Sequence, residues 1–576
     1  MDISKQQQTV LSVDNLSVSF LHEGTTHYAV KNISFELHKG ETLGIVGESG
    51  SGKSLTSLAI MGLLPVNALT QGDVIFHGNR KTNLLSLPEK EMRKWRGNKI
   101  AMIFQEPMTS LNPAYRCGVQ VIENILEHEH IHYKEAKTRV LTLFEEVMLP
   151  DPERIFNAYP HQLSGGQKQR VMIAMALACN PDILIADEPT TALDVTVQKN
   201  ILLLIKSLQQ KHKISLVFIS HNLDVIAEVA SDVLVMYKGE IVEQGSISEI
   251  FNHPQHAYTK GLLACRPPML QRPRRLQTIH DFIEKEDFIY ADNNNIGKEE
   301  RFLSHARLYS TPPLIKVENL STSFVTKRNF FGKPLKKHLA VNNVNFDIYE
   351  GETLGLVGES GCGKTTLGRT LLRLSEPSLG SIIYKHILIN ELNATALRNL
   401  RKDIQIIFQD PYSSLNPRLT VGEAILEPMR VHALHGTEKE RRAKMEELLI
   451  KVGLSETHSR RYPHEFSGGQ RQRICIARSI SVEPRFIICD ESVSALDVSV
   501  QAQILNLLND LKKEMGLTYL FISHDLSVVR YMSDRLMVMQ QGSIVEMGEA
   551  DDVYERPATT YTKTLLDAIP KGIIKN

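Results

Sequence analysis

The chain has 576 residues, of which 42% are hydrophobic and 23% charged, and its formal net charge is zero. This composition is that of a globular protein with room for two buried cores, and the balanced charge gives no reason to expect nucleic acid as a partner. The six cysteines form no C-x-x-C pair, and no apolar run approaches the roughly 18 residues that cross a bilayer, so zinc sites, iron–sulfur clusters and membrane spans are not indicated.

The first residues, MDISKQQQTVLSV, lack the basic and apolar blocks of a signal peptide. We therefore expect a protein that stays inside the cell, where its cysteines are reduced.

The first half opens with an alternating strand pattern over 11–20 and a second strand over 42–46, which leads into a glycine-rich loop. This loop, GESGSGKS at 47–54, has the phosphate-binding pattern, in which glycines let the backbone N–H groups approach the phosphates. Lys53 should reach the β and γ phosphates, and Ser54 should offer its hydroxyl to Mg²⁺. A helix is expected directly after the loop, because its positive end also attracts phosphate.

Further along the first half, apolar residues at helical spacing between 140 and 148 indicate a core-facing helix. The apolar run 183–186 predicts a buried strand of a mostly parallel sheet, and Asp187 and Glu188 follow it directly. The aspartate suits water-mediated Mg²⁺ binding, and the glutamate suits orienting and deprotonating a water that attacks the γ-phosphate. A buried strand that ends in this pair also occurs in proteins without such chemistry.

Residues 266–313 show no sustained periodicity and include runs such as QRPRR and DNNNIGK, so we predict a linker there. The pattern of the first half then returns. Strand patterns over 314–324 and 353–357 lead into a second phosphate loop, GESGCGKT at 358–365. A buried strand is expected again over 486–489, followed by a second Asp-Glu pair.

The motifs of the two halves occur in the same order and at nearly the same spacing. The two loop lysines are 311 positions apart, and from Ser164 and Ser467 onward the offset between matching residues stays at 303. A repeat of this length is a whole domain rather than a solenoid unit. We therefore predict two homologous domains, residues 1–265 and 314–576, each with its own C-terminal tail.

Each half also contains a five-residue motif, LSGGQ at 163–167 and FSGGQ at 466–470, which resembles the signature of ATP-binding-cassette ATPases. The resemblance covers both halves nearly end to end. It implies an α/β fold with two P-loop ATPase domains in tandem, each with a RecA-like, mostly parallel sheet core, an antiparallel β subdomain and a helical signature subdomain. It also implies two composite ATP sites, in which the signature of one half closes over the phosphate loop of the other.

The resemblance implies roles for residues in both halves. Gln105 and Gln409 would lie in flexible loops that touch the metal site and the transport partner, and His221 and His524 would contact the γ-phosphate. The implied catalytic residues are Glu188, His221, Gln105, Glu491, His524 and Gln409. The implied Mg²⁺ residues are Ser54, Gln105, Asp187, Thr365, Gln409 and Asp490. The implied ATP-binding residues are Phe20, Gly47, Ser49, Gly50, Ser51, Gly52, Lys53, Ser54, Ser164, Gly165, Gly166 and Gln167, together with Phe324, Gly358, Ser360, Gly361, Cys362, Gly363, Lys364, Thr365, Ser467, Gly468, Gly469 and Gln470.

The aromatic residue that stacks on the adenine in this family is best matched by Phe20 and Phe324. Tyr28 is an alternative in the first half only, because Leu339 stands at the matching place in the second half. The resemblance also implies that the aspartates of TALD and SALD, Asp194 and Asp497, communicate between the two sites.

One departure from the family pattern occurs in the second half. DESVSALD replaces the common DEPTSALD, so Ser492 and Val493 stand where the first half has Pro189 and Thr190. Losing a proline frees the backbone just after the glutamate, which affects the stiffness of this turn rather than its reacting groups.

Finer resemblances point to one subfamily. The stretches IFQEPMTSLNP at 103–113 and IFQDPYSSLNP at 407–417 are similar to the corresponding loops of oligopeptide, dipeptide and nickel importers, as are both tails, at 253–268 and 556–570, and an insertion at 327–337. The fused form resembles the ATPases of microcin C-type peptide uptake. The resemblance implies a subunit on the cytoplasmic face of the inner membrane, with two integral membrane permease subunits, an extracytoplasmic solute-binding protein, and peptides or peptide-like solutes as cargo. Many relatives carry a cysteine cluster for an iron–sulfur centre after the tail, which this chain lacks.

Two alternatives remain at this point. The chain could be a soluble fused pair that acts on ribosomes or DNA, although its linker is not the long charged helix of translation-type pairs and it lacks the zinc cysteines of DNA-repair types. A nucleotide-binding scaffold is disfavoured because both glutamates are present.

The alternating His128, His130 and His132 suggest either a metal site or, more simply, a solvated surface, since positions two apart do not face each other on a helix. The transported solute is not specified by this chain.

Overall fold

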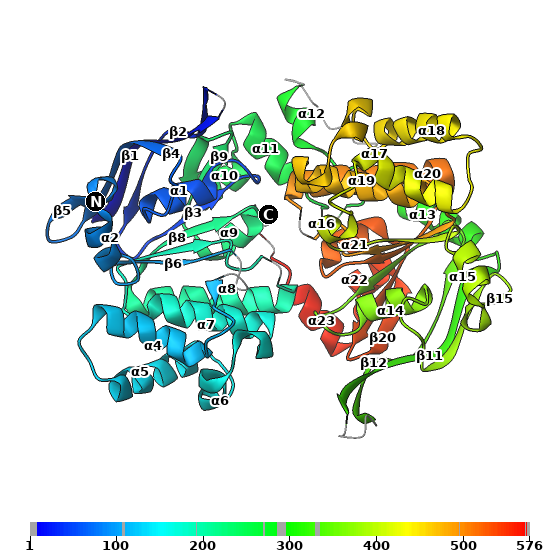
Figure 1. The fold of residues 1–576 in the computed structure, drawn as a ribbon, viewed down its shortest axis with the longest axis horizontal. Helices are drawn as coiled ribbons and strands as arrows, with labels where there is room; N and C mark the ends of the chain where they lie inside the picture. Colours follow the sequence, from blue (N-terminus) through cyan, green and yellow to red (C-terminus); the bar gives the residue numbers. More distant parts are fainter. Residues whose placement is uncertain are drawn as a thin grey trace.

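The structure is a computed structural model that describes residues 8–22, 24–105, 110–191, 193–268, 271–284, 295–328, 334–494, 496–570 and 572. Figure 1 shows the two halves side by side, the first in blue to green and the second in yellow-green to red, each built around its own sheets. No helix within the described part of the chain is both long and apolar enough to cross a membrane.

The first half contains two sheets. The six-stranded sheet has the order β10-β9-β3-β8-β7-β6 and is parallel except where β10 meets β9. The four-stranded sheet has the order β2-β1-β4-β5 and is antiparallel. The strands are β1 (Thr9–His22), β2 (Thr25–His38), β3 (Thr42–Val46), β4 (Ala68–His77), β5 (Lys81–Asn83), β6 (Ile100–Ile103), β7 (Ile183–Asp187), β8 (Ser215–Ser220), β9 (Asp232–Tyr237) and β10 (Glu240–Ser246).

The second half repeats both sheets. Its mostly parallel sheet has the order β16-β17-β18-β13-β19-β20, and its antiparallel sheet has the order β12-β11-β14-β15. The predicted fold class is thereby confirmed. The strands are β11 (Pro313–Arg328), β12 (Pro334–Tyr349), β13 (Thr353–Val357), β14 (Leu379–Tyr384), β15 (Ile387–Leu388), β16 (Ile404–Ile407), β17 (Phe486–Asp490), β18 (Thr518–Ile522), β19 (Arg535–Gln540) and β20 (Ser543–Glu549).

The central strands are buried along their whole length. In β3, β7 and β17 every residue is buried, which explains why they are continuous apolar runs rather than alternating patterns. Because parallel strands end at one edge of a sheet, β3 and β7 deliver the phosphate loop and the Asp-Glu pair to the same place.

The helices of the first half cover the sheet and form a separate helical layer. Helices α4, α5 and α6 pack on one another, and α4 and α5 also contact α7, which carries the signature at its start. The helices are α1 (Lys53–Ile60), α2 (Glu89–Trp95), α4 (Cys117–His128), α5 (Tyr133–Glu146), α6 (Pro152–Asn157), α7 (Gly165–Leu177), α8 (Val195–His212), α9 (Leu223–Val229), α10 (Ile247–Asn252) and α11 (Ala257–Ala264).

The second half has the matching layer, in which α17 and α18 pack on α19. Its helices are α14 (Lys364–Leu371), α15 (Ala394–Leu400), α16 (Pro411–Ser414), α17 (Val421–Val431), α18 (Glu438–Lys451), α19 (Gly468–Ile480), α20 (Val498–Met515), α21 (Leu526–Met532), α22 (Ala550–Glu555) and α23 (Thr560–Asp567).

The segment predicted as a linker contains two helices that were not predicted, α12 (Ile279–Ile283) and α13 (Lys298–Leu308). Helix α13 buries one side chain, Arg301, rather than an apolar stripe, so no hydrophobic period marks it in the sequence. The Arg301 guanidinium lies 2.6 Å from Glu549, pairs with Asp551 and donates at 3.0 Å to the carbonyl of Asp534. Helix α13 therefore docks on the second half through charge, whereas α12 contacts α11 of the first half.

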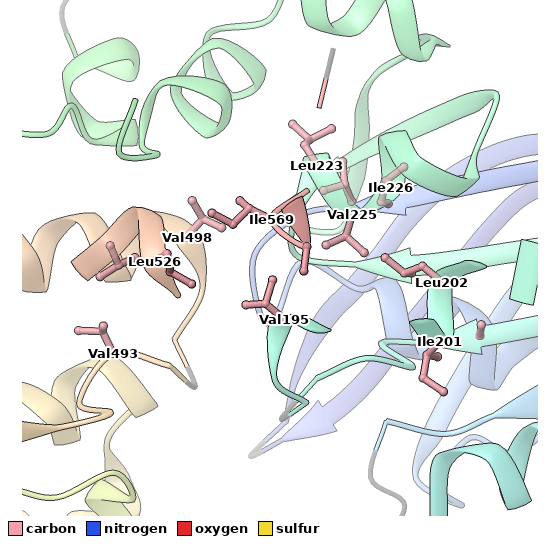
Figure 2. Close-up of a cluster of buried hydrophobic side chains, with 14 of the residues drawn as sticks. Val195, Ile201, Leu202, Leu223, Val225, Ile226, Val493, Val498, Leu526 and Ile569 are labelled. Atoms are coloured by element: carbon pink, nitrogen blue, oxygen red, sulfur yellow. The ribbon is translucent and has the colours of Figure 1, made fainter. Parts of the chain in front are cut away.

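One apolar cluster includes residues of both halves. It contains Val195, at the start of α8, and Val498, at the start of α20. Figure 2 shows Ile569, just after α23, between Val498 of the second half and Val195 and Val225 of the first. The tail of the second half thus packs against the first half.

Candidate functional site

The two phosphate loops connect β3 to α1 and β13 to α14. Gly52, the residue before α1, has φ 101°, and a Cβ there would lie 2.8 Å from the carbonyl oxygen of Ala29. Gly363, before α14, has φ 114°. Only glycine adopts this backbone without strain, so Gly52 and Gly363 are required by the close passage of a neighbouring strand.

The loop lysines are held inside their own loops. The Lys53 ammonium donates to the carbonyl oxygens of Gly47 at 2.7 Å and Glu48 at 2.8 Å. Lys364 makes the same two bonds in its loop, at 2.8 and 3.0 Å. Each lysine is 4% exposed, and burial lowers the pKa of Lys53 although nearby carboxylates oppose this. A phosphate entering the loop would meet a positive charge that is already in position.

In each half, two of the three residues predicted to hold Mg²⁺ are in contact. The Ser54 hydroxyl donates to the Asp187 carboxylate at 3.1 Å, and the Thr365 hydroxyl donates to Asp490 at 2.9 Å. Burial raises the pKa of Asp187 to about 6, against the hydrogen bond from Ser54. A cation at this place would remove that effect, because it would stabilise the ionised carboxylate.

Three side chains of the first site contact the Glu188 carboxylate. It accepts hydrogen bonds from the Gln105 amide at 3.0 Å and the Thr191 hydroxyl at 2.9 Å, and it lies 3.3 Å from Nδ1 of His221. Burial alone would raise the pKa of Glu188, but the hydrogen bond and charge of His221, with further help from Thr191, lower it to about 2. Its φ of 46° is in the left-handed region, an uncommon conformation that aims the side chain off the end of β7.

The second site repeats this arrangement. The Gln409 amide donates to Glu491 at 2.8 Å, Nδ1 of His524 lies 3.4 Å away, and the Lys364 ammonium lies at 3.9 Å. Glu491 has φ 47°. Burial opposes ionisation, but His524 and Lys364 together lower the pKa of Glu491. Both glutamates are therefore ionised at neutral pH.

The residue after each glutamate differs between the halves, being Pro189 in the first and Ser492 in the second. The N–H of Glu188 donates to the carbonyl of Ile219 at 3.0 Å, and the N–H of Glu491 makes the equivalent bond at 2.9 Å, so the turn begins in the same way with and without the proline. We expect Ser492→Pro to raise the free energy of unfolding of the second half by about 0.4–1 kcal/mol, because the matching Pro189 is accommodated in the first half.

ATP turnover should change less than about twofold in Ser492→Pro, because no reacting group moves. Denaturant midpoints and phosphate release measure the two effects. Pro189→Ser is the matched control and should lower the stability of the first half by a similar amount. A tenfold loss of turnover in Ser492→Pro would show that the flexibility of this turn is used in catalysis.

The signature motifs begin helices α7 and α19. The Ser164 hydroxyl accepts from the N–H of Gln167 at 3.3 Å while the Gln167 side chain accepts from the N–H of Ser164 at 3.1 Å. Ser467 and Gln470 make the same reciprocal cap. The serines and the first glycines are exposed, so both helix N-termini are open to an anion.

The two halves meet through their phosphate loops and through the SALD aspartate and a threonine just after TALD. The Ser49 hydroxyl in the first loop donates to Asp497 of the second half at 3.0 Å. The Thr196 hydroxyl of the first half donates to Glu359 in the second loop at 3.0 Å. Between the halves lies a cavity of about 690 Å³ whose lining includes both His221 and His524. Each phosphate loop is therefore partly covered by the other half.

The predicted stacking aromatics are placed differently in the two halves. Phe20 is half-buried against the core of its half, whereas Phe324 is 44% exposed. Tyr28 is 50% exposed on β2. The stacking role of these residues stays a prediction.

The contacts of the site that were not predicted include two within the first half. The N–H of Glu48 donates to the tail hydroxyl of Tyr258, and Thr191 bonds Glu188. Tyr258 and Tyr561 are 303 positions apart, like the other matching residues, so the sequence marks this pair of tyrosines. It does not show that Tyr258 bonds Glu48 in the phosphate loop. Within the described residues no group of three or more His, Cys, Asp or Glu side chains could hold a metal ion, and this includes the region around His128, His130 and His132. The insertion at 327–337 lies partly outside the described residues.

Comparison with known proteins places this geometry in a family. The model described as "ABC transporter" matches residues 30–191 and 341–494, and the model described as "Oligopeptide/dipeptide transporter, C-terminal region" matches 242–285 and 545–573. The chain is 49% identical to the glutathione import ATP-binding protein GsiA of Escherichia coli O6:H1 over 97% of this chain and 89% of that protein. It is 48% identical to the protein of the same name from Pectobacterium atrosepticum, over 98% of this chain and 90% of that protein.

Among solved structures, a dimeric ATP-binding cassette in a post-hydrolysis state, bound to ADP and phosphate, is 30% identical to this chain. It covers 41% of this chain and 98% of its own, with a TM-score of 0.37.

Proposed function

The chain belongs to the ABC transporter family and is an ATP-binding, ATP-hydrolysing subunit of an importer; from this premise we propose which residues carry the reaction and what the importer takes up. Both halves hold a full set of reacting groups, so we assign hydrolysis to two sites. The complete second set, around Glu491, argues against one active and one degenerate site.

Mg²⁺ fits the residues present, because a hydroxyl and a carboxylate oxygen meet in each half and hard oxygen ligands suit this ion. Ser54 with Asp187, and Thr365 with Asp490, would hold it; Gln105 and Gln409 bond the glutamate that follows each aspartate. When bound, the ion neutralises charge on the β and γ phosphates. Lys53 and Lys364 bind those phosphates, since their ammonium groups already point into the loops.

Glu188 and Glu491 orient and deprotonate the attacking water. Each carboxylate is ionised, as a proton acceptor must be, because the neighbouring histidine lowers its pKa. His221 and His524 hold the glutamate side chains in place and contact the γ-phosphate. Gln105 and Gln409 link the state of each site to the membrane subunits. The exposed serines and glycines of each signature close over the opposite phosphate loop.

The partners we propose are two integral membrane permease subunits and an extracytoplasmic solute-binding protein, with this chain on the cytoplasmic face of the membrane. Next to the glutamine loops, Phe104 is 37% exposed and Tyr412 is 54% exposed, which gives each half an aromatic residue where a short permease helix could dock. Closing the halves around ATP would move both docking places together, and hydrolysis would reset them.

The solute we propose is a small peptide of the glutathione kind. The observation that carries this is the 49% identity to a glutathione import protein over 97% of the chain, together with an oligopeptide/dipeptide transporter tail in both halves. The soluble alternative, action on ribosomes or DNA, has no observation in its favour beyond the fused architecture.

We expect cells that make this chain with its membrane subunits to take up labelled glutathione, and uptake to fall to background when the only copy carries Glu188→Gln and Glu491→Gln. Glu89→Gln, on the exposed face of α2, is the matched control and should leave uptake unchanged. Competition by unlabelled di- and tripeptides would define the range of solutes. Full uptake by the double variant, or co-purification of the chain with ribosomes in place of membrane subunits, would reject the proposal.

A further inference from the structure

The second residue of each phosphate loop is a glutamate that forms three kinds of contact at once. In the first loop, the N–H of Glu48 donates to the Tyr258 hydroxyl at 2.9 Å, and its carbonyl accepts from the Lys53 ammonium at 2.8 Å. Its carboxylate accepts a hydrogen bond from the hydroxyl of Ser499, in the other half. One residue thus connects the tail of its own half, the phosphate-binding lysine and the opposite half.

The second loop makes the same three contacts with different residues. The N–H of Glu359 donates to the Tyr561 hydroxyl at 3.1 Å, and its carbonyl accepts from Lys364 at 3.0 Å. Its carboxylate accepts from the Thr196 hydroxyl of the first half at 3.0 Å. Ser499 and Thr196 occupy matching positions in the two halves. The arrangement is therefore a property of both sites rather than an accident of one.

The tail end of this relay is rigid. Tyr258 is fully buried in α11, and its ring stacks on Tyr237 of β9 with 4.3 Å between centroids. Burial raises its pKa, so the hydroxyl stays neutral and remains an acceptor for the N–H of Glu48. A fixed acceptor holds the start of the phosphate loop at a constant distance from the sheet.

The opposite end moves with the other half. Ser499 is 1% exposed in the first turn of α20, two residues after Asp497, which accepts from Ser49. Thr196 has the same place in α8, where the single hydrogen of its hydroxyl is shared between Glu359 and the Asp194 carboxylate, 2.7 Å away. A shift of one half against the other therefore changes the contact of Ser499 to the Glu48 carboxylate together with the contact of Ser49 to Asp497.

We propose that Glu48 and Glu359 are positioning residues that couple closure of the two halves to the phosphate-loop lysines, with Tyr258 and Tyr561 as their hydrogen-bond partners in the tails. This inference rests on the proposed function of the same two sites. The residue whose carboxylate contacts the opposite half also provides one of the two carbonyl oxygens that hold the lysine ammonium. By linkage, ATP in one loop must then favour the closed contact with the other half to the same extent.

A double-mutant cycle on the purified chain, with ATP hydrolysis and ATP binding as readouts, tests the relay. We expect Glu48→Ala to lower kcat by about tenfold and to reduce the Hill coefficient for ATP, with the dissociation constant for ATP within about twofold, since the lysine itself remains. Ser499→Ala should add little to Glu48→Ala, because both remove one contact. Thr196→Ala should add its full effect, because it acts on the other loop; this cross-site pair is the matched control.

The conservative variants separate positioning from folding. Glu48→Gln keeps an acceptor oxygen and should retain most of the activity that Glu48→Ala loses. Tyr258→Phe removes only the hydroxyl and should lower kcat by about threefold to tenfold, whereas Tyr133→Phe, on the exposed start of α5, should have no effect.

Equal non-additivity in the same-site and cross-site pairs, or wild-type kinetics in Glu48→Ala, would overturn the relay while leaving the ATPase assignment intact. A wild-type chain that binds no ATP and releases no phosphate would instead reject the proposed function.

Discussion

Replacing Glu188 and Glu491 with glutamine together should reduce phosphate release by about 10²–10⁴-fold, the usual contribution of a positioned general base. Glutamine has the shape of glutamate and keeps one acceptor oxygen for Gln105, Thr191 and His221, so the pocket around it should persist. ATP binding should therefore be retained. Phosphate release and equilibrium binding of labelled ATP measure the two effects separately.

Single variants refine this expectation. If both sites hydrolyse ATP in one cycle, the Glu188→Gln variant should lose far more than half of the ATPase activity, because a site that cannot hydrolyse ATP keeps the halves closed. Glu89→Gln on α2 is again the matched control. Unchanged phosphate release in the double variant would mean that a group other than these carboxylates activates the water.

The features that were predicted from the sequence are contiguous in the chain. The phosphate loops were predicted from glycines next to a lysine and a hydroxyl residue, and the strand before each Asp-Glu pair was predicted from an unbroken apolar run. Strand β3 (Thr42–Val46) has the predicted bounds. The α/β fold with its two kinds of sheet follows from the family resemblance and is confirmed.

The features that were missed depend on partners far apart in the sequence. Ser49 and Asp497 are 448 positions apart and Glu48 and Ser499 are 451 apart, so no local pattern links them. The relay is further hidden because the matching donors are a serine in one half and a threonine in the other. Helix α13 was missed for a different reason, since it is fixed by the ion pairs of Arg301 rather than by an apolar face.

The assignment of each signature to the opposite site predicts a large effect for Gly468→Asp. Gly468 is the exposed first residue of α19, and a Cβ there would have only Leu496 near it, at 3.9 Å, so the substitution fits without a clash. A carboxylate at a helix N-terminus also stabilises the helix, so folding should be preserved. Gly469 is unsuitable for this test, because its Cβ would collide with Val500.

In the closed chain this carboxylate would face the γ-phosphate held by Lys53 and replace an attractive helix end by a negative charge. We expect the rate of hydrolysis at that site to fall by about 10²-fold or more, as when a preorganised electrostatic contact is lost. Trapping a labelled ATP analogue and then separating the halves by cleavage within 266–313 would locate the loss. Gly297→Asp, at the N-terminus of α13 with open space around it, is the matched control for an added charge at a helix start. The label should disappear from the loop that contains Lys53 and persist at Lys364 if, as we propose, the signature in the second half closes the site in the first; disappearance from Lys364 alone would mean that each half completes its own site.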